Sequence, residues 1–181
     1  MTLPEPFEDF VRANQDIVYS TAIRLLGSDA DAKDVSQQTF LRAWTHWIDL
    51  ERSPTATAWL RTVARNLCLN HLSRYRSRWR FFSELTHDDH SNEERELPFA
   101  VEETPPQDYL EEDQCEIVED AIEKLPTDQR VALVLYHFED LDYLEIAKQL
   151  GVSLGKVKTD IHRARAALKK KLQLRVAELG V

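Results

Sequence analysis

Apolar residues recur every three or four positions in the first 82 residues, which is the spacing of one face of an α-helix. The pattern predicts three successive helices. Their apolar stripes are Phe7, Phe10, Val11, Val18, Ala22 and Leu25, then Val35, Phe40, Ala43, Trp44 and Trp47, then Trp59, Leu60, Val63, Leu67, Leu69 and Leu72. Gly27 is expected to end the first helix, Ser28 to cap the second, and Pro54 to lie in the loop before the third. The tryptophans within these stripes are expected to be core residues, so this part of the chain predicts a compact helical bundle.

The same spacing returns in residues 113–181, in shorter pieces. The stripes are Val118, Ala121, Ile122 and Leu125, then Val131, Val134, Leu135 and Phe138, then Ile146, Ala147 and Leu150, then Val157, Ile161, Ala164, Leu168 and Leu172. Pro126 is expected to end the first piece, with Thr127 or Asp128 capping the second. Asp142 and Glu145 have the spacing of a reciprocal cap, Gly151 suits a left-handed turn, and Ser153 suits the cap of the last helix.

Two short helices joined by a glycine-containing turn, the second strongly basic, are typical of a helix-turn-helix. At about 100° per residue, the outward face of the second helix carries Gly155, Thr159, His162 and Arg163, with Lys156 and Lys158 on its flanks. Such residues can reach base edges in the major groove. Arg165 and the lysines after it, Lys169, Lys170 and Lys171, are better placed for phosphates. The alternative is an ordinary antiparallel helix pair with a basic surface.

The formal net charge of -9 argues at first against a nucleic-acid partner, but its distribution reverses that conclusion. Residues 58–82 hold six basic and no acidic residues, and residues 156–175 hold eight basic and one acidic. Residues 83–120 between them hold one basic and 15 acidic. Dense like charge and three prolines predict a flexible acidic linker over residues 83–112. The fold class expected is therefore all-α, with helical domains at 1–82 and 113–181.

The first basic block mixes guanidinium groups with amides and aromatic rings, a combination that binds phosphates and exposed bases. Its candidate single-strand contacts are Arg61, Arg65, Asn66, Asn70, Arg74 and Arg76. The alternative is a solvated helix face that only keeps the domain soluble. No acidic residue offsets the arginines, which favours nucleic-acid contact.

Other features exclude classes of protein. The two cysteines, Cys68 and Cys115, form no C-x-x-C pair, which fits a reducing cytoplasm without disulfides or a cysteine-based zinc site. Neither a signal peptide nor a membrane-spanning apolar run is visible, so no membrane insertion is expected. No catalytic triad, paired carboxylates or phosphate loop appears, so neither an enzyme nor a cofactor is expected. A metal cluster at His87, Asp88, Asp89 and His90 is disfavoured, because it would lie in the flexible linker.

The two halves together resemble bacterial RNA polymerase sigma factors of the extracytoplasmic-function group of the sigma-70 family. The first half resembles sigma region two through residues 34–44 (DVSQQTFLRAW), residues 59–66 (WLRTVARN) and residues 70–72 (NHL). The second half resembles region four through Leu125-Pro126, Glu145-Ile146-Ala147, Leu150-Gly151-Val152-Ser153, Gly155-Lys156-Val157-Lys158 and His162-Arg163-Ala164-Arg165.

The resemblance implies roles for particular residues. Core RNA polymerase would bind the exposed polar face of the helix over residues 34–47, which includes Asp34, Gln37, Gln38 and Arg42. A base-capture loop near residues 66–70 would take a flipped base of the melted minus-ten element of promoter DNA. The helix from Leu154 would read the minus-thirty-five element. The linker would thread polymerase channels, where an acidic strand could mimic nucleic acid. An anti-sigma factor is an expected partner.

Three positions depart from the family pattern: Gln38 stands where an acid is usual, Lys156 replaces a common Thr, and Asp160 replaces a basic or neutral residue. Asp160 is expected beside the DNA face, where it would repel phosphate or accept from a cytosine amino group. Two other classes stay open, namely a helix-turn-helix regulator that acts without polymerase and an adaptor that binds only protein. The second basic block favours the sigma interpretation, because opening a promoter needs a second set of DNA contacts.

Overall fold

The computed structural model describes residues 5–83 and 112–179, and every regular element in these two ranges is an α-helix. The chain divides into two compact units, Met1–Ser77 and Arg78–Val181. The all-α prediction is confirmed. The interior of the predicted linker, residues 84–111, lies outside the described residues, together with the His87 to His90 cluster. Among the helices described, none combines the length and the apolar character needed to cross a bilayer.

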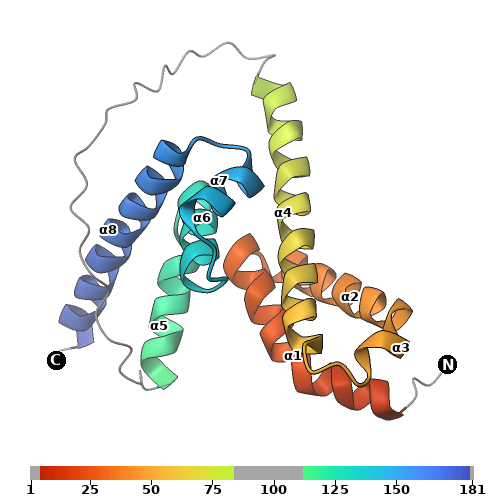
Figure 1. Cartoon of the computed structure of the whole chain (residues 1–181). Helices are drawn as coiled ribbons and strands as arrows, with labels where there is room; N and C mark the ends of the chain where they lie inside the picture. The colour runs from red at the N-terminus through yellow and green to blue at the C-terminus, as the bar shows by residue number, and fades with distance from the viewer. Residues whose placement is uncertain (1–4, 84–111, 180–181) are drawn as a thin grey trace. The chain divides into compact units, whose positions relative to one another are not determined.

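The first unit is built from α1 (Glu5–Leu26), α2 (Asp29–Thr45), the short α3 (Trp47–Leu50) and the start of α4 (Ala56–Ser83). Helices α1 and α2 pack along each other (Figure 1). The turn between them is as predicted. Gly27 has a positive φ of 63°, and the Ser28 hydroxyl accepts from the amide of Asp31. A local glycine stop and a local side-chain cap therefore set where α1 ends and α2 begins.

The core of the first unit joins apolar side chains from all four helices. Its buried members are Phe7, Val18, Ala43, Leu50, Ala56, Leu60 and Ala64. A polar bridge crosses beside it, in which the buried Asn14 accepts from the Thr57 hydroxyl at 2.8 Å and donates to the Phe10 carbonyl at 2.8 Å. This bridge ties the first turn of α4 to α1.

The second helix departs from its prediction at its C-terminal end. The helix stops at Thr45, and Trp47 begins α3 instead of continuing the stripe. Trp44, expected in the core, is 41% exposed, although its ring makes an edge contact with Phe7 at 4.9 Å between centroids. Spacing alone placed Trp44 on the inner side, but at the end of a helix the bundle leaves one side of a large ring uncovered.

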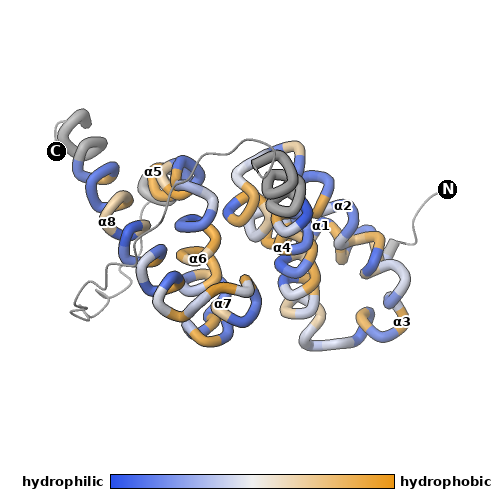
Figure 2. Tube along the Cα trace, turned by 90° about the horizontal axis from the view of Figure 1, so that it is seen from above, coloured by the Kyte–Doolittle hydropathy of each residue, from blue (hydrophilic) through white to orange (hydrophobic). Residues whose placement is uncertain are grey.

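The second unit contains α5 (Glu112–Glu123), α6 (Thr127–His137), α7 (Tyr143–Leu150) and α8 (Leu154–Leu179). Helix α8 packs against each of the other three. The trace coloured by hydropathy shows hydrophobic residues concentrated in α6 (Figure 2), where residues 131–135 are all buried. Helix α6 is thus the core helix of this unit, while α8 buries the stripe that contains Val157, Ile161 and Ala164.

The junction between α5 and α6 differs from its prediction. The cap position of α6 is Pro126, and neither Thr127 nor Asp128 supplies a side-chain cap. Instead, the buried Arg130 reaches back from α6, and its Nη1 donates to the carbonyls of Glu123 at 3.0 Å and Leu125 at 3.3 Å. The last carbonyls of a helix lack intrahelical partners, so this guanidinium satisfies the end of α5.

Candidate nucleic-acid interface

Local hydrogen bonds fix the start of α7 and the turn between α7 and α8. Asp142 Oδ1 accepts from the amide of Glu145 at 2.8 Å, and Glu145 Oε2 accepts from the amide of Asp142 at 2.9 Å, which completes the predicted capping box. Gly151 ends α7 in the left-handed region, at φ 65° and ψ 36°. The Ser153 hydroxyl then accepts from the amide of Lys156 and caps α8. The structure confirms the predicted helix-turn-helix.

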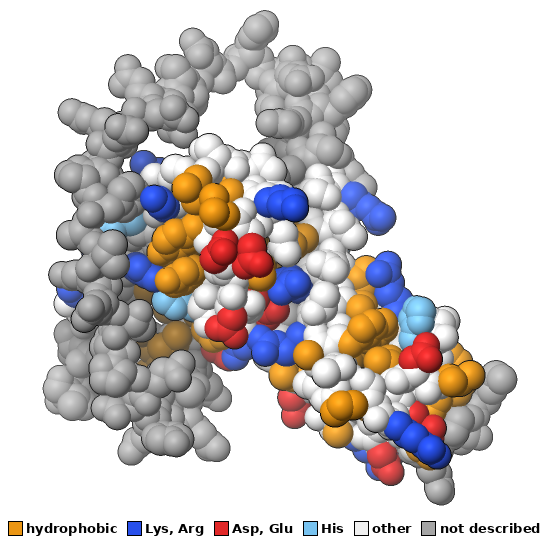
Figure 3. All heavy atoms as spheres, viewed as in Figure 1, with side chains coloured by type: hydrophobic (Ala, Val, Ile, Leu, Met, Phe, Trp, Pro, Cys, Tyr) orange, Lys and Arg blue, Asp and Glu red, His pale blue; other side chains and the backbone are white. Residues whose placement is uncertain are grey.

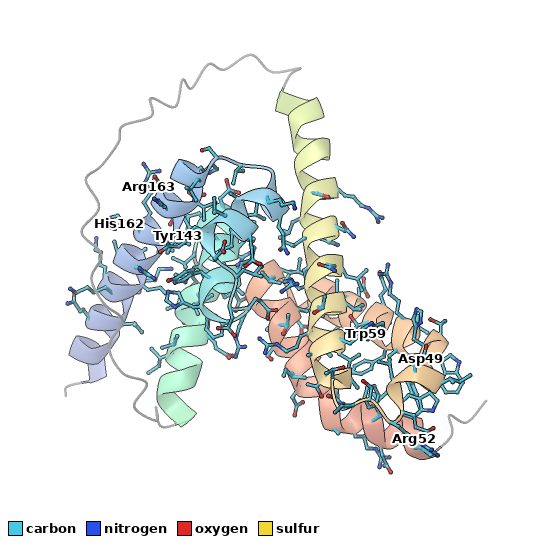
Figure 4. The ribbon with its side chains drawn as sticks, viewed as in Figure 1. Asp49, Arg52, Trp59, Tyr143, His162 and Arg163 are labelled. Atoms are coloured by element: carbon cyan, nitrogen blue, oxygen red, sulfur yellow. The ribbon has the colours of Figure 1, made fainter. Side chains whose placement is uncertain are left out.

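The outer side of α8 carries most of the residues predicted to reach bases. Gly155, His162 and Arg163 are exposed, whereas Lys158 and Thr159 are half-buried. Figure 4 shows His162 and Arg163 projecting from the side of α8 away from α6. A Cβ added at Gly155 would meet no heavy atom within 4 Å, so the backbone is open at this position. The result is a basic, accessible face that starts at a helix N-terminus.

The Asp160 side chain lies on a different side of α8 from the one predicted, and Lys156 pairs with it. Asp160 was expected beside the DNA face, but it is only 7% exposed. Its carboxylate accepts from Lys156 Nζ at 3.0 Å, and the same ammonium lies 3.2 Å from Asp128 Oδ2 on α6. The prediction for Asp160 is wrong because the residue lies three positions after Val157 and four before Ala164, on the buried side of α8.

Arg165 lies on a cluster of rings between α6, α7 and α8. Its guanidinium sits 5.4 Å from the centroid of Tyr136, which stacks on Tyr143 at 4.8 Å. Arg165 Nε donates to His137 Nε2 at 3.2 Å, so that ring nitrogen must be unprotonated. Desolvation and then the Arg165 charge lower the pKa of His137. Arg165, predicted as a DNA contact, is thus exposed but also braced within the unit.

The first basic block lies on a continuous helix, and this corrects the expectation of a base-capture loop near residues 66–70. These residues fall in the middle of α4, where Cys68 is fully buried as a small apolar side chain. The side chains of Asn66, Asn70 and Arg74 are exposed, and their spacing of four residues places them on one face.

The other arginines of the block divide into two groups. Arg61 and Arg65 are half-buried and leave α4 in a different direction from this face. Arg76, Arg78 and Arg80 belong to α4 as well, but their side chains lie outside the described part of the structure. The structure therefore brings together three of the six predicted single-strand contacts, Asn66, Asn70 and Arg74, and does not bring Arg61 and Arg65 to the same face.

The four residues predicted to bind polymerase share one face of α2. Asp34, Gln37, Gln38 and Arg42 are all exposed. Sequence reasoning made no use of the apolar side chains beside them, because these fall outside the predicted apolar stripes. Leu41 is 66% exposed between these polar groups, and Ile48 on α3 is 93% exposed. Figure 3 shows hydrophobic side chains at the surface of the first unit, among charged ones.

The loop before α4 is a second feature that sequence reasoning did not use. Arg52, Pro54 and Thr55 are exposed there, and the Ser53 and Thr55 hydroxyls lie 3.0 Å apart. Figure 4 shows Asp49 and Arg52 near the junction of α3 with this loop, and Trp59 on α4. The signal available in the sequence was Pro54 with its polar neighbours, which marks an exposed loop next to the aromatic start of α4.

Two family models match separate parts of the chain. The model for sigma-70 region 2 matches residues 10–79, and the model for sigma-70 region 4 matches residues 115–168. The first covers α2, α3 and most of α1 and α4, and the second covers the helix-turn-helix. Each of the two units thus contains one matched region.

Individual relatives match across both units. The chain is 34% identical over 163 residues to the ECF RNA polymerase sigma factor SigE of Mycolicibacterium smegmatis, covering 90% of this chain and 60% of that protein's length. It is 31% identical over 171 residues to the RNA polymerase sigma-E factor of Streptomyces coelicolor, covering 93% of this chain and 87% of the relative. The sigma factor RpoE of Bartonella quintana, solved in complex with the anti-sigma factor NepR, aligns with a TM-score of 0.50 and 25% identity, covering 94% of this chain and 98% of that one.

Proposed function

The chain belongs to the extracytoplasmic-function sigma factors of the sigma-70 family, which bind core RNA polymerase and direct promoter-specific transcription initiation, and we propose how its described helices divide that work. Helix α8 reads the minus-thirty-five element in the major groove. The exposed face of α4 contacts the melted minus-ten strand. The exposed face of α2 binds the polymerase. We propose that these are binding roles without a catalytic step of the chain's own and that they are carried out in the cytoplasm.

The assignment of α8 rests on one observation, the exposed basic face that begins directly after the fixed α7–α8 turn. A major groove about 12 Å wide admits an α-helix, and the N-terminal residues of that helix reach the base edges. Arg163 is exposed on this face and has the reach for bidentate contact with a guanine. His162 and Gly155 lie on the same exposed side, and the half-buried Thr159 and Lys158 border it.

Footprinting of the reconstituted holoenzyme on a promoter tests the role of Arg163. Arg163→Ala is expected to weaken binding to the upstream element by about 1–3 kcal/mol, roughly five- to 150-fold in affinity, while downstream contacts persist. Lys124→Ala is the matched control, because it removes an exposed cation of the same unit whose ammonium pairs with Asp120 on α5. Unchanged protection in Arg163→Ala would refute the assignment.

The proposed single-strand contact on α4 rests on the shared exposure of Asn66, Asn70 and Arg74. Extruding a base costs a few kcal/mol, which hydrogen bonds and stacking on this face would have to recover. Replacing Asn66 and Asn70 together by Ala is expected to reduce open-complex formation on duplex promoters. A promoter with a premelted minus-ten region should be affected less, since its bases are already unstacked. An equal loss on both templates would count against capture of a flipped base.

The proposed polymerase surface on α2 combines Asp34, Gln37, Gln38 and Arg42 with the exposed Leu41. An exposed apolar side chain ringed by polar groups is typical of a protein interface. Leu41→Glu is expected to reduce affinity for core polymerase without changing the fold, because the side chain is already 66% in solvent. Gln15→Glu on α1, which adds the same charge at an exposed position outside α2, is the control, and equal loss of affinity in both variants would refute the surface.

An anti-sigma factor is the further partner that we propose, supported by the alignment with the sigma factor solved in complex with NepR. Such a partner would compete with polymerase for the α2 face. A regulator acting without polymerase is the alternative. It would bind a duplex operator tightly as the isolated protein, whereas the proposed function requires core polymerase for tight promoter binding.

A further inference from the structure

Lys156, a lysine at the start of α8, lies between two carboxylates. The Nζ atom of Lys156 lies 3.0 Å from Asp160 Oδ2, one turn later on α8. It also lies 3.2 Å from Asp128 Oδ2, in the first turn of α6. The contacts therefore join two helices whose paired residues are far apart in the sequence.

The burial of Asp160 makes this cluster different from a surface ion pair. Its side chain keeps 11% of its accessible surface, against 40% for that of Lys156 and 42% for that of Asp128. A carboxylate withdrawn from water is costly unless it is paired and hydrogen-bonded, and the Lys156 ammonium supplies both. Burial opposes the charge of Lys156, but the hydrogen bonds and charges of Asp160 and Asp128 raise its pKa, so the cation is maintained.

The Lys156 ammonium differs in its charged neighbours from a lysine that contacts phosphate. It faces two carboxylates, so its positive charge is already compensated within the protein. Affinity for DNA comes largely from basic groups that replace counterions on phosphates. An ammonium held between Asp128 and Asp160 would have to leave both carboxylates, one of them buried, before it could pair with a phosphate.

We propose that Asp128 and Asp160 hold Lys156 away from DNA and use it as a clamp that fixes the N-terminal turn of α8 on α6. Lys156 is then a positioning residue, and the outer side of α8, with Gly155, His162 and Arg163, makes the contacts. The clamp lies at the end of α8 that enters the groove, so it determines the angle at which this outer side meets the base pairs. The inference rests on the proposed function of α8.

The salt dependence of promoter binding by the holoenzyme tests the clamp, because the slope of log K against log salt changes by about 0.9 for each phosphate contact to duplex DNA. Lys156→Met should leave the slope unchanged. Lys170→Met, the matched loss of an exposed lysine that the sequence places at phosphates on the same helix, should make it shallower by about 0.9. If Lys156→Met is poorly folded because Asp160 loses its partner, the double variant Lys156→Met with Asp160→Asn removes both charges and should give the same slope as the wild type.

The reverse experiment releases the lysine. Asp128→Asn combined with Asp160→Asn should steepen the slope by about 0.9, and adding Lys156→Met should restore the wild-type slope. Discrimination among single-base variants of the upstream element should fall when the clamp is lost and return in Lys156→Arg, which can bridge both carboxylates. A purely structural role would not predict the steeper slope of the released form.

The outcomes separate the clamp from the proposed function. A shallower slope in both Lys156→Met and Lys170→Met would overturn the clamp and leave the function of α8 intact. Unchanged slopes in Lys170→Met and in the released variant would overturn the proposed approach of α8 to DNA, and the clamp with it. An unchanged slope in Lys156→Met together with a shallower one in Lys170→Met supports both.

Discussion

Gly151 provides a stringent test of how the helix-turn-helix is built. The residue ends α7 at φ 65° and ψ 36°, and its amide donates to the carbonyl of Ala147. L-residues with a Cβ avoid this left-handed region, whereas glycine enters it freely. We therefore expect Gly151→Ala to destabilise the α7–α8 turn.

The magnitude follows from the space around the residue. A Cβ added at Gly151 meets no heavy atom within 4 Å, so no steric clash adds to the backbone strain. Left-handed geometry costs an L-residue roughly 1–2 kcal/mol. The smaller conformational freedom of alanine in the unfolded chain offsets about 0.4–1 kcal/mol of that cost. The net loss of unfolding free energy is about 1 kcal/mol, close to a fivefold change in the ratio of folded to unfolded protein.

Gly155→Ala is the matched control. A Cβ at Gly155 also meets open space, but this residue lies in α8 and has no positive φ. Alanine is favoured over glycine within a helix by roughly 0.5–1 kcal/mol, so this variant should be neutral or more stable. The two substitutions add the same methyl group, but Gly151→Ala should lower the free energy of unfolding and Gly155→Ala should not.

Hydrogen exchange of the α7 and α8 amides is the appropriate assay. All four tryptophans lie between Trp44 and Trp79, so their fluorescence would not report on the α7–α8 turn. Exchange measures the opening free energy of these helices directly. Equal protection in Gly151→Ala and the wild type, or equal losses in Gly151→Ala and Gly155→Ala, would refute the reasoning from backbone strain.

Three further predictions concern single side chains. Asp142→Ala removes the side-chain acceptor of the capping box and should cost about 0.5–2 kcal/mol by thermal unfolding, and an unchanged melting temperature would contradict the role of the cap. Because partial desolvation and the Arg165 charge lower the pKa of His137, its contribution to stability is complete above its ordinary pKa of about 6.5 and is lost as the pH falls toward the lower folded value. His137→Gln should therefore flatten the dependence of the denaturant midpoint of the second unit on pH below about 6.5. A pH dependence parallel to that of the wild type would exclude His137 as its source. Asn14→Ala breaks two hydrogen bonds and should cost about 2 kcal/mol in urea unfolding, more than Thr57→Val, which breaks only their shared bond.

The sequence by itself determined where most helices begin and end, because those signals act over three or four residues. The Ser28 cap, the Asp142–Glu145 capping box and the Gly151 turn each depend on neighbours in the chain, and all three formed as predicted. The division into an N-terminal bundle and a C-terminal helix-turn-helix also follows from local periodicity and charge. The same patterns identified the exposed face of α8, whereas the family resemblance identified that of α2.

Tertiary structure alone decided where the long charged side chains go. Lys156 meets Asp128, Arg165 meets His137, and Asn14 meets Thr57, across 28, 28 and 43 positions of sequence respectively. A lysine or arginine can reach several partners around its helix, and the choice depends on which neighbouring helix packs there. Helical spacing gives the direction in which a side chain leaves its own helix, whereas helix packing determines the partner and the exposure. For this reason spacing alone placed Trp44 in the core, and the family pattern placed Asp160 beside the DNA, whereas packing in the second unit buries it.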